Sequence, residues 1–422
     1  MTTQWNKWPK IRFADICKHS AFGPRFSGEL YAVDGNVATL RTTDIREDGR
    51  IEYLTMPLAK LDLSNLQQHI LLKGDLVITR SGRVGTTAVF EEFRLPVLPG
   101  AFLIRFRVKP EIADPHFYKY YFNSPEGHDQ VISTATGSVQ QNLNITSLHM
   151  LEVPIPPLPI QQAIVSILGS LDDMIEIHRR MNKTLEAKGK AIFRSWFVDF
   201  DPVRAKVERR ENGHLRKIDA LFPDEFEEIE GREVPRGWKV GSLSESFDIK
   251  MGQSPPGITY NETGDGIPFF QGRTDFGFRY PSTRVYCTAP TRFAEIGDTL
   301  VSVRAPVGDI NLTKEKCCIG RGVAAVRHKT GSRSFTYYQM LALKEIFALF
   351  ESEGTVFGAI NKTDFNSLEC IIVPENIITK FEEIVYPIDQ MIENNEQQAR
   401  SLVTIRDSLL PRLMSGEIPV QM

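Results

Sequence analysis

The sequence predicts a mixed α/β (α+β) fold in which two similar domains are each followed by a long helix, the two helices pairing as an antiparallel coiled coil. Three observations lead to this prediction. The chain repeats itself at a constant shift of 217 residues, which indicates a duplicated unit. Each half opens with short β-rich runs separated by glycine turns. Each half closes on an apolar pattern with a period of about 3.5 residues, which is typical of a coiled coil.

The repeat is clearest toward the end of each half, where the shift stays constant. Residues matched there include Asn144 with Asn361, Leu151 with Leu368, Asp172 with Asp389, Met174 with Met391, and Glu176 with Glu393. Upstream the shift grows, to 223 at Gly74 and 230 at Trp8. Insertions therefore accumulate toward the start of each half. We interpret the later segments as a constant scaffold and the earlier ones as two separately adjustable binding domains.

Composition and pattern divide the chain into five predicted segments. They are a first binding domain (1–158), a first spacer helix (159–199), a charged linker (200–236), a second binding domain (237–375) and a second spacer helix (376–416). In the linker, a basic tract gives way to an acidic one. Such blocks are typical of a solvated connection, although an exposed basic tract can also contact phosphates.

Each binding domain is predicted to be mixed α/β. The β-rich runs are 75–79 and 101–108 in the first domain and 298–303 and 322–326 in the second. In the run 101–108, arginines alternate with apolar residues, as in a half-exposed strand. An aromatic-rich helical segment follows in each domain, at 117–132 and 335–350.

The spacer helices carry the heptad pattern. A proline cluster at 154–159 predicts a rigid exit from the first domain, and a helix follows from about 160 to 198. The predicted seam consists of Ile164, Leu168, Leu171, Ile175, His178, Asn182 and Leu185 in the first helix and Phe381, Val385, Ile388, Ile392, Asn395 and Leu402 in the second. The polar centre of the seam either fixes register and partner or points to solvent on a curved helix.

Composition excludes several classes of protein. With a formal net charge of −3, any surface for nucleic acid must be local. No run approaches the roughly 18 apolar residues of a membrane span, so we expect no membrane association. Five cysteines without a Cys-x-x-Cys pair predict neither a disulfide framework nor a zinc site, and favour the cytoplasm.

Enzyme motifs are also missing from the sequence. It has no phosphate-binding Gly-x-x-x-x-Gly-Lys loop, no His-Glu-x-x-His helix and no Asn-Pro-Pro-aromatic tetrad. Asp199 and Asp201 near Lys206 superficially resemble a nuclease cluster. Their place at a helix end favours capping instead. We therefore expect a non-catalytic protein without a cofactor or metal.

An ordered set of motifs carries a resemblance to a known family. The set comprises Gly-Asp-Leu-Val-Ile-Thr-Arg at 74–80, the helix end at 193–206, the proline exit and heptad helix, and Leu-Leu-Pro-Arg-Leu-Met-Ser-Gly at 409–416. Together they resemble the specificity (S) subunits of type I restriction-modification systems. The second half departs from this pattern at 373–376, where the proline cluster thins.

The resemblance implies a function and partners. Each domain would be a target-recognition domain that reads one half of a bipartite, asymmetric site in double-stranded DNA. Two methyltransferase (modification) subunits would dock on the chain, and restriction (helicase-nuclease) subunits would join them. In that family S-adenosylmethionine and ATP belong to those subunits, so this chain would bind no cofactor.

Antiparallel pairing is our hypothesis, because each domain precedes its own helix; the linker is long enough for either direction. Antiparallel helices would place the domains at opposite ends, whereas parallel helices would crowd them together. The half-sites would then lie on the order of one DNA turn apart. Two alternatives remain: a protein–protein assembly scaffold with two binding heads, and the specificity component of another restriction-modification architecture.

Candidate DNA-reading residues are arginines, which pair with guanine, and amides, which pair with adenine. In the first domain they are Arg80, Ser81, Arg83, Gln140, Gln141 and Asn142. In the second they are Gln271, Arg273, Arg279, Arg304 and Thr355. The alternative for the turn at 80–85 is that its glycines serve a tight turn and Arg80 pairs with a carboxylate of its own domain.

Overall fold

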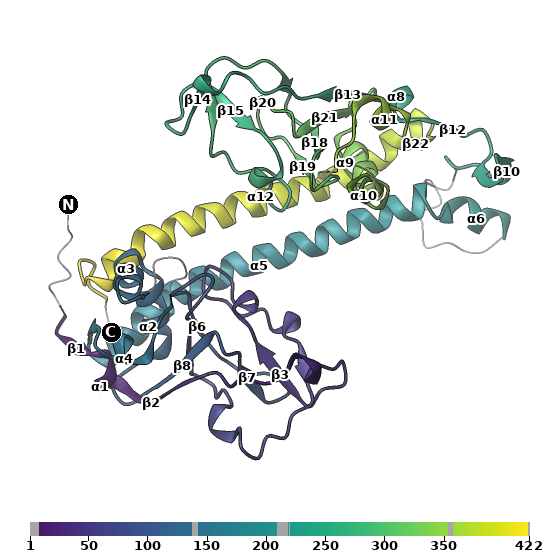
Figure 1. The fold of residues 1–422 in the computed structure, drawn as a ribbon. Coiled ribbons are helices and arrows are strands. Elements are labelled where there is room, and N and C mark those ends of the chain that lie inside the picture. The colour runs from purple at the N-terminus through teal and green to yellow at the C-terminus, as the bar shows by residue number, and fades with distance from the viewer. Residues whose placement is uncertain (1–7, 137–141, 209–217, 219, 353–357, 421–422) are drawn as a thin grey trace. The chain divides into compact units, whose positions relative to one another are not determined.

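A computed structural model describes residues 8–136, 142–208, 218, 220–352 and 358–420 (Figure 1). The chain forms two compact units. The first comprises Met1–Ile177 with Gln398–Met422, and the second comprises His178–Gln397. Helix α5 (Leu158–Phe197) starts in the first unit and ends in the second, and helix α12 (Glu375–Met414) does the reverse.

The first unit contains a four-stranded antiparallel sheet in the order β2-β8-β5-β6 and a smaller sheet in the order β4-β3-β7. These strands are β2 (Cys17–Phe22), β3 (Val37–Leu40), β4 (Leu58–Ala59), β5 (Leu76–Thr79), β6 (Thr87–Val89), β7 (Val97–Pro99) and β8 (Leu103–Val108). Strand β5 is buried on both faces, since Leu76 and Ile78 face one core and Val77 another. Burial on both faces explains its continuous apolar run.

Strands β1 (Lys10–Arg12) and β9 (Glu152–Pro154) pair and bring the start and end of the first domain together. Between them lie α1 (Phe13–Ile16), α2 (Pro115–Asn123), α3 (Pro125–Ser133) and α4 (Ile145–His149). The single helical segment predicted at 117–132 is thus two helices. Pro125 cannot continue α2, and the Ser124 side chain caps α3 by accepting from the Gly127 N–H.

The second unit repeats this plan. Its four-stranded sheet has the order β13-β21-β18-β19, formed by β13 (Phe247–Met251), β18 (Thr299–Ser302), β19 (Ile310–Leu312) and β21 (Val323–His328). The smaller sheet, in the order β14-β16-β15-β20-β17, consists of β14 (Tyr260–Asn261), β15 (Ile267–Phe270), β16 (Tyr286–Cys287), β17 (Phe293–Ala294) and β20 (Cys317–Ile319). Strands β12 (Lys239–Ser242) and β22 (Glu369–Ile372) pair as β1 and β9 do.

The helices of the second unit are α8 (Leu243–Ser246), α9 (Arg333–Ala342), α10 (Lys344–Ser352) and α11 (Lys362–Ser367). Here too the segment predicted as one helix, 335–350, is divided between two. Leu343, the C-cap of α9 with φ −83° and ψ 2°, separates α9 from α10.

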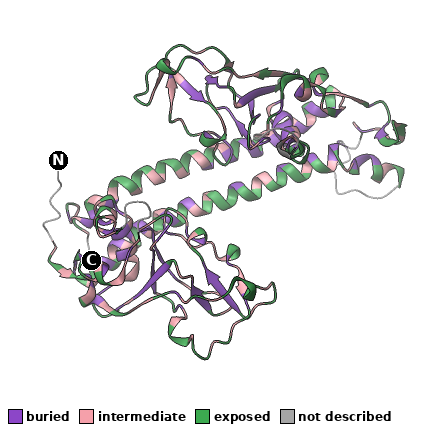
Figure 2. Ribbon diagram, viewed as in Figure 1, coloured by how far each residue is buried: buried purple, intermediate pink, exposed green. Residues whose placement is uncertain are grey.

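The segment between the domains is folded where the structure describes it. Helix α6 (Asp201–Val207) and the hairpin β10 (Phe226–Ile229) and β11 (Arg232–Pro235) lie there. Phe200, Val203 and Phe222 are buried in the same core as Trp238. The prediction of a solvated linker is therefore wrong for the described part of 200–236. Apolar residues spaced between the charges pack inward while the charges stay at the surface (Figure 2).

The long helices run antiparallel, as predicted. In the first unit, Asp172 on α5 pairs with Arg406 on α12. In the second unit, Asn182 bonds to the carbonyl of Ile392, and the ring of Phe193 lies 5.8 Å from that of Phe381. Partner numbers fall along α12 as they rise along α5. The seam residues Ile164, Leu168, Ile175, Phe381, Val385, Ile388 and Ile392 are buried, and Leu171, Leu185 and Leu402 are half-buried.

The polar centre of the seam faces inward. The Asn395 side chain donates to Asn182 Oδ1 over 2.9 Å, and Asn182 donates to the Ile392 carbonyl over 3.2 Å. His178 Nδ1 lies 3.3 Å from Asn395 Oδ1. The solvent-facing alternative is wrong for the two asparagines, which are 3% and 8% exposed. Because these bonds form in one register only, the asparagines fix the alignment of the helices.

Candidate nucleic-acid interface

The two binding domains share one backbone frame at the edge where their two sheets meet. In the first domain the N–H groups of Gly23, Arg80 and Gly100 donate to the carbonyls of Leu103, Phe102 and Leu40 over 3.1, 2.9 and 2.8 Å. In the second, those of Gly252, Val303 and Gly320 donate to Val323, Gly322 and Phe270, each over 2.9 Å. We call the loops joined by these bonds the first rim (22–25, 41–45, 80–83 and 100–102) and the second rim (251–254, 271–275, 303–304 and 320–322).

A glycine is required where two loops of each rim cross. A Cβ atom at Gly23 would lie 2.1 Å from the carbonyl oxygen of Gly100. A Cβ atom at Gly252 would lie 2.2 Å from that of Gly320. Since neither backbone oxygen can yield as a flexible side chain does, the same close approach has been kept in both halves of the duplication.

The side chains on this frame differ between the two rims. The matching hydrogen bonds align Arg41 with Gln271, Arg80 with Val303, Ser81 with Arg304, Ala101 with Arg321, and Phe102 with Gly322. One backbone therefore presents two different sets of donors and apolar groups. This is the arrangement expected of two related surfaces that recognise different partners.

The first rim surrounds a hollow of about 580 Å3. Its lining includes Arg25, Phe26, Tyr31, Arg41, Thr42, Thr43 and Phe102. Phe102 is 57% exposed, and the Arg80 guanidinium carbon lies 4.7 Å from the centroid of the Phe22 ring. Among the described residues, Arg80 forms no ion pair and its buried Nε has no hydrogen-bond partner. Basic and aromatic side chains gathered in this way suit contact with phosphates and base faces.

Arg83 lies in the turn that follows Arg80. Its guanidinium donates to the Ile45 carbonyl over 3.1 Å and lies 3.3 Å from Glu47 Oε1. Both side chains of this ion pair remain largely exposed. Gly82 and Gly85 have φ angles of 75° and 88°, so the turn does require glycine at these positions. Ser81 is buried.

In the second rim, Gln271, Arg273 and Arg304 are exposed, although Arg273 is 3.0 Å from Asp309. In the first domain, Asn142 is half-buried and exchanges backbone hydrogen bonds with Thr136. Gln140, Gln141 and Thr355 lie outside the described residues. Arg25, Phe102 and Arg321 belong to the rims but were not among the sequence candidates. The repeat could have indicated Arg321, because Gly320 matches Gly100 and Arg321 directly follows Gly320 in the sequence.

Arg279 is not placed as a DNA contact. It is 0% exposed, and its Nη1 lies 2.9 Å from Asp389 Oδ1. Its Nη2 donates to the Tyr338 hydroxyl over 2.8 Å, and its guanidinium carbon lies 4.0 Å from the Tyr337 ring centroid. Burial raises the pKa of Asp389, and the Arg279 guanidinium opposes this rise. A guanidinium with no exposed surface and a committed carboxylate partner cannot reach a base in this conformation.

The residues resembling a nuclease cluster are engaged locally. Asp199 accepts from Arg194 over 2.9 Å, and Lys206 donates to the carbonyl of Phe222 over 2.6 Å. Within the described ranges, no group of three or more His, Cys, Asp or Glu side chains is arranged to hold a metal ion. None of the helices in that part of the chain is long and apolar enough to cross a bilayer.

Comparisons with known proteins agree with this architecture. The family described as "Type I restriction modification DNA specificity domain" matches residues 7–187 and 235–402, more than half of the chain. The HindI specificity subunit of Haemophilus influenzae is 25% identical, over 97% of this chain and 99% of the relative. The MjaIX specificity subunit of Methanocaldococcus jannaschii is 24% identical, over 83% and 79%. The crystal structure of an S subunit from M. genitalium has the same fold, with a TM-score of 0.59, 17% identity and 96% coverage of both chains.

Proposed function

The chain belongs to the type I restriction-modification DNA specificity family, as its motifs indicated, and from that premise we propose that it is the subunit that selects the DNA target. In this proposal the two domains read the two halves of a bipartite, asymmetric site in double-stranded DNA. The chain carries out no chemical step itself. It directs associated modification and restriction subunits to the site.

The observation that carries the proposal is the pair of rims. Each rim rests on the same backbone hydrogen bonds, yet Arg80 of one stands where Val303 stands in the other, and Ser81 where Arg304 stands. Sequence-specific reading needs donors and acceptors placed differently for each base, on a frame that meets the DNA backbone in a constant way. A duplicated protein–protein scaffold that bound two copies of one partner would have no need to exchange the polar groups on a preserved frame.

The surface of α5 supports an assembly with other subunits. Ile167, Met174 and Ile177 are 38%, 47% and 52% exposed, at spacings that keep them near one side of the helix. Met391, which matches Met174 in the repeat, is 49% exposed on α12. Exposed apolar rows of this kind mark surfaces that a partner covers. We assign them to the two methyltransferase subunits, which restriction (helicase-nuclease) subunits then join.

The test is to express the chain with a methyltransferase subunit of the same restriction-modification system, in a host lacking other DNA methylation, and to map the methylated bases of the genome. We expect one motif made of two short defined halves with a constant undefined gap. Arg304→Ala on the second rim should relax one half only. Arg236→Ala, which removes an exposed arginine outside both rims, is the matched control. A contiguous motif, or methylation without sequence preference, would contradict the proposal.

A further inference from the structure

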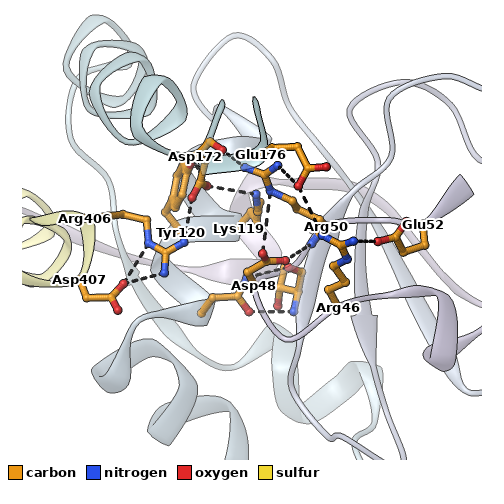
Figure 3. Close-up of polar contacts among 12 residues, drawn as sticks. Arg46, Asp48, Arg50, Glu52, Lys119, Tyr120, Asp172, Glu176, Arg406 and Asp407 are labelled. Carbon is orange, nitrogen blue, oxygen red and sulfur yellow. Dashed lines mark hydrogen bonds and ion pairs between the residues drawn. The ribbon is translucent and has the colours of Figure 1, made fainter. Parts of the chain in front are cut away.

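A cluster of polar side chains ties the first domain to both long helices (Figure 3). Its centre is Asp172 on α5, which is 6% exposed. The Tyr120 hydroxyl, from α2 of the domain, donates to Asp172 Oδ2 over 2.7 Å. Arg406 Nη1, from α12, donates to Asp172 Oδ1 over 2.8 Å. One buried carboxylate thus joins three elements of the unit.

The loop at 46–52 is fastened to α5 at the same place. Arg50 Nη2 donates to the backbone carbonyl of Asp172, and Arg50 Nη1 lies 3.1 Å from Glu176 Oε2. Arg46 reaches the same carboxylate over 3.4 Å. Lys119 lies 4.0 Å from Asp172 Oδ2, and burial lowers the pKa of this amine. The cations of the loop and the carboxylates of the helix therefore hold each other in one arrangement, as Figure 3 shows.

The other end of this loop belongs to the first rim. Arg41, which lines the hollow, binds Asp44 through two hydrogen bonds of 2.8 and 3.0 Å. The Glu52 N–H donates to the Asp44 carbonyl over 2.8 Å, and Ile45 pairs with Ile51. Residues 41–52 therefore form one stiff connection, which we call the first strap. It runs from the rim to α5.

The second unit contains the same connection with different residues. The short 3₁₀ helix Arg273–Asp275 lies on the second rim, and the Ser282 N–H donates to the Asp275 carbonyl over 2.8 Å. Between them, Arg279 reaches Asp389, which is the residue that matches Asp172 in the repeat. We call residues 271–282 the second strap. In each half, an arginine of the strap contacts the long helix at matching positions: Arg50 at Asp172 and Arg279 at Asp389. This recurrence supports the connection independently of the details of either cluster.

We propose that the straps are positioning devices for DNA reading, with Arg50 and Arg279 holding each rim in place on its long helix. This inference rests on the proposed function. Neither arginine touches DNA in it. A reading loop that is ordered before binding loses less conformational entropy in the complex. The anchored arginine therefore acts through the rim residues at the other end of its strap, and its loss loosens the choice of bases in one half-site.

The test uses the assembled methyltransferase complex and the genomic methylation map. Arg25→Ala and Arg304→Ala, one on each rim, first assign each half of the motif to a domain. Arg50→Ala is then expected to relax the half assigned by Arg25, and Arg279→Ala the half assigned by Arg304. Discrimination at the affected positions should fall by about tenfold, the value of one good base contact. The other half of the motif is the internal control in each case.

Second variants separate positioning from folding. Glu176→Gln removes the charge that Arg46 and Arg50 share without opening a cavity, and it should reproduce the effect of Arg50→Ala in weaker form. Arg279→Lys keeps the buried cation but not its planar contacts. A purely structural role would lower complex yield or melting temperature and leave the motif unchanged in both halves.

The outcomes distinguish the two proposals. If the rim variants relax their halves while all the strap variants leave the motif intact, the straps do not position the rims and the proposed function stands. If neither rim nor strap variants change the motif, the rims do not read DNA and the proposed function itself is wrong. Selective relaxation of opposite halves by Arg50→Ala and Arg279→Ala supports both.

Discussion

The clusters around Asp172 and Asp389 occupy the same place in the repeat, yet the arginine that meets the carboxylate comes from a different element in each. In the first unit, Arg406 of α12 reaches Asp172. The residue that matches Arg406 in the other helix is Gly189, and there a tyrosine fills the space. A Cβ atom at Gly189 would lie 2.2 Å from the Tyr338 hydroxyl, which itself donates to Asp389 over 3.0 Å. Duplication preserved the carboxylate and a tyrosine that donates to it, Tyr120 or Tyr338, while the arginine comes from a different element in each unit.

The two clusters also differ in how far their charged side chains are exposed to solvent. Arg50 and Glu176 each keep 19% of their side-chain surface exposed, and Asp172 retains Tyr120 and Arg406 whatever happens to Arg50. Arg279 is fully buried, and the other groups that hydrogen-bond to Asp389 in the described part of the unit, the hydroxyls of Tyr338 and Ser334, carry no charge. The cluster around Asp172 is a network from which one member can be lost. The cluster around Asp389 depends on a single buried cation, Arg279. The two units should therefore respond unequally to equivalent substitutions.

The largest effect is expected from removing the strap arginines. Arg279→Ala leaves Asp389 buried without its cation, which should destabilise the second unit by about 3–5 kcal/mol. Arg50→Ala should cost the first unit about 1 kcal/mol, because its ion pair is partly solvated and redundant. Hydrogen exchange followed by mass spectrometry reports local opening in each unit separately. Equal losses of protection in the two units would contradict this account of the two clusters.

The contrast between the straps shows where sequence reasoning stops. The repeat, the heptad seam and the antiparallel pairing were predictable, because periodicity and chain order are local or topological properties. Arg279 was not placed correctly. An arginine in a loop has the same sequence signature whether it faces a base or a carboxylate that lies on another element far along the chain.

The charge pattern of the segment between the domains also led to a wrong prediction, that of a solvated linker. The acidic and basic blocks of 200–236 dominate the pattern, and the apolar residues Phe200, Val203 and Phe222 are too few to establish a period. Their burial depends on a core assembled from distant segments, including Trp238 and Phe381. The rims depended on long-range contacts as well. The repeat alone aligns their glycines, but only the folded sheets bring Gly23 to Gly100 and so define which side chains share a surface.

A second contrast concerns pH. Val108 ends β8 in the first domain, and His328 ends the matching strand β21 in the second. Burial, with a smaller contribution from Lys329, lowers the pKa of His328 to about 4. Its Nδ1 accepts from the Thr330 N–H over 3.2 Å, which requires an unprotonated ring nitrogen. An unfolded chain takes up this proton near its ordinary value of 6.5, so unfolding binds a proton between these two pH values.

The free energy of unfolding of the second unit should therefore fall by up to about 3 kcal/mol as the pH is lowered from 6.5 to 4. His328→Val, which installs the side chain of the first domain, should remove this part of the pH dependence. Urea unfolding monitored by the fluorescence of Trp196 and Trp238, both in the core of the second unit, measures the difference between wild type and variant. Parallel curves for the two proteins over this range would show that His328 does not titrate as expected.

The smallest effect should come from two glycines of α5, which face different surroundings. A Cβ atom at Gly169 would meet nothing within 4 Å. Gly169→Ala should therefore stabilise the first unit by up to about 1 kcal/mol, since alanine is the better helix former. Gly189→Ala gains the same propensity but pushes against Tyr338, which is buried and bonded to both Arg279 and Asp389. Overpacking at such a site should leave a net loss of about 1–2 kcal/mol.

If Gly169→Ala raises the free energy of unfolding and Gly189→Ala lowers it, then Gly189 is needed for the close approach of Tyr338 and not for flexibility of the helix. Thermal unfolding gives the sign for each variant, and hydrogen exchange assigns it to a unit. The double variant Gly189→Ala with Tyr338→Ala is the decisive control. Removing the whole ring removes both close contacts, 2.2 Å to the hydroxyl oxygen and 2.4 Å to the ring carbon that carries it, so the alanine at position 189 should cost less in this background than in the wild type. An unchanged cost would mean that the tyrosine does not explain the glycine.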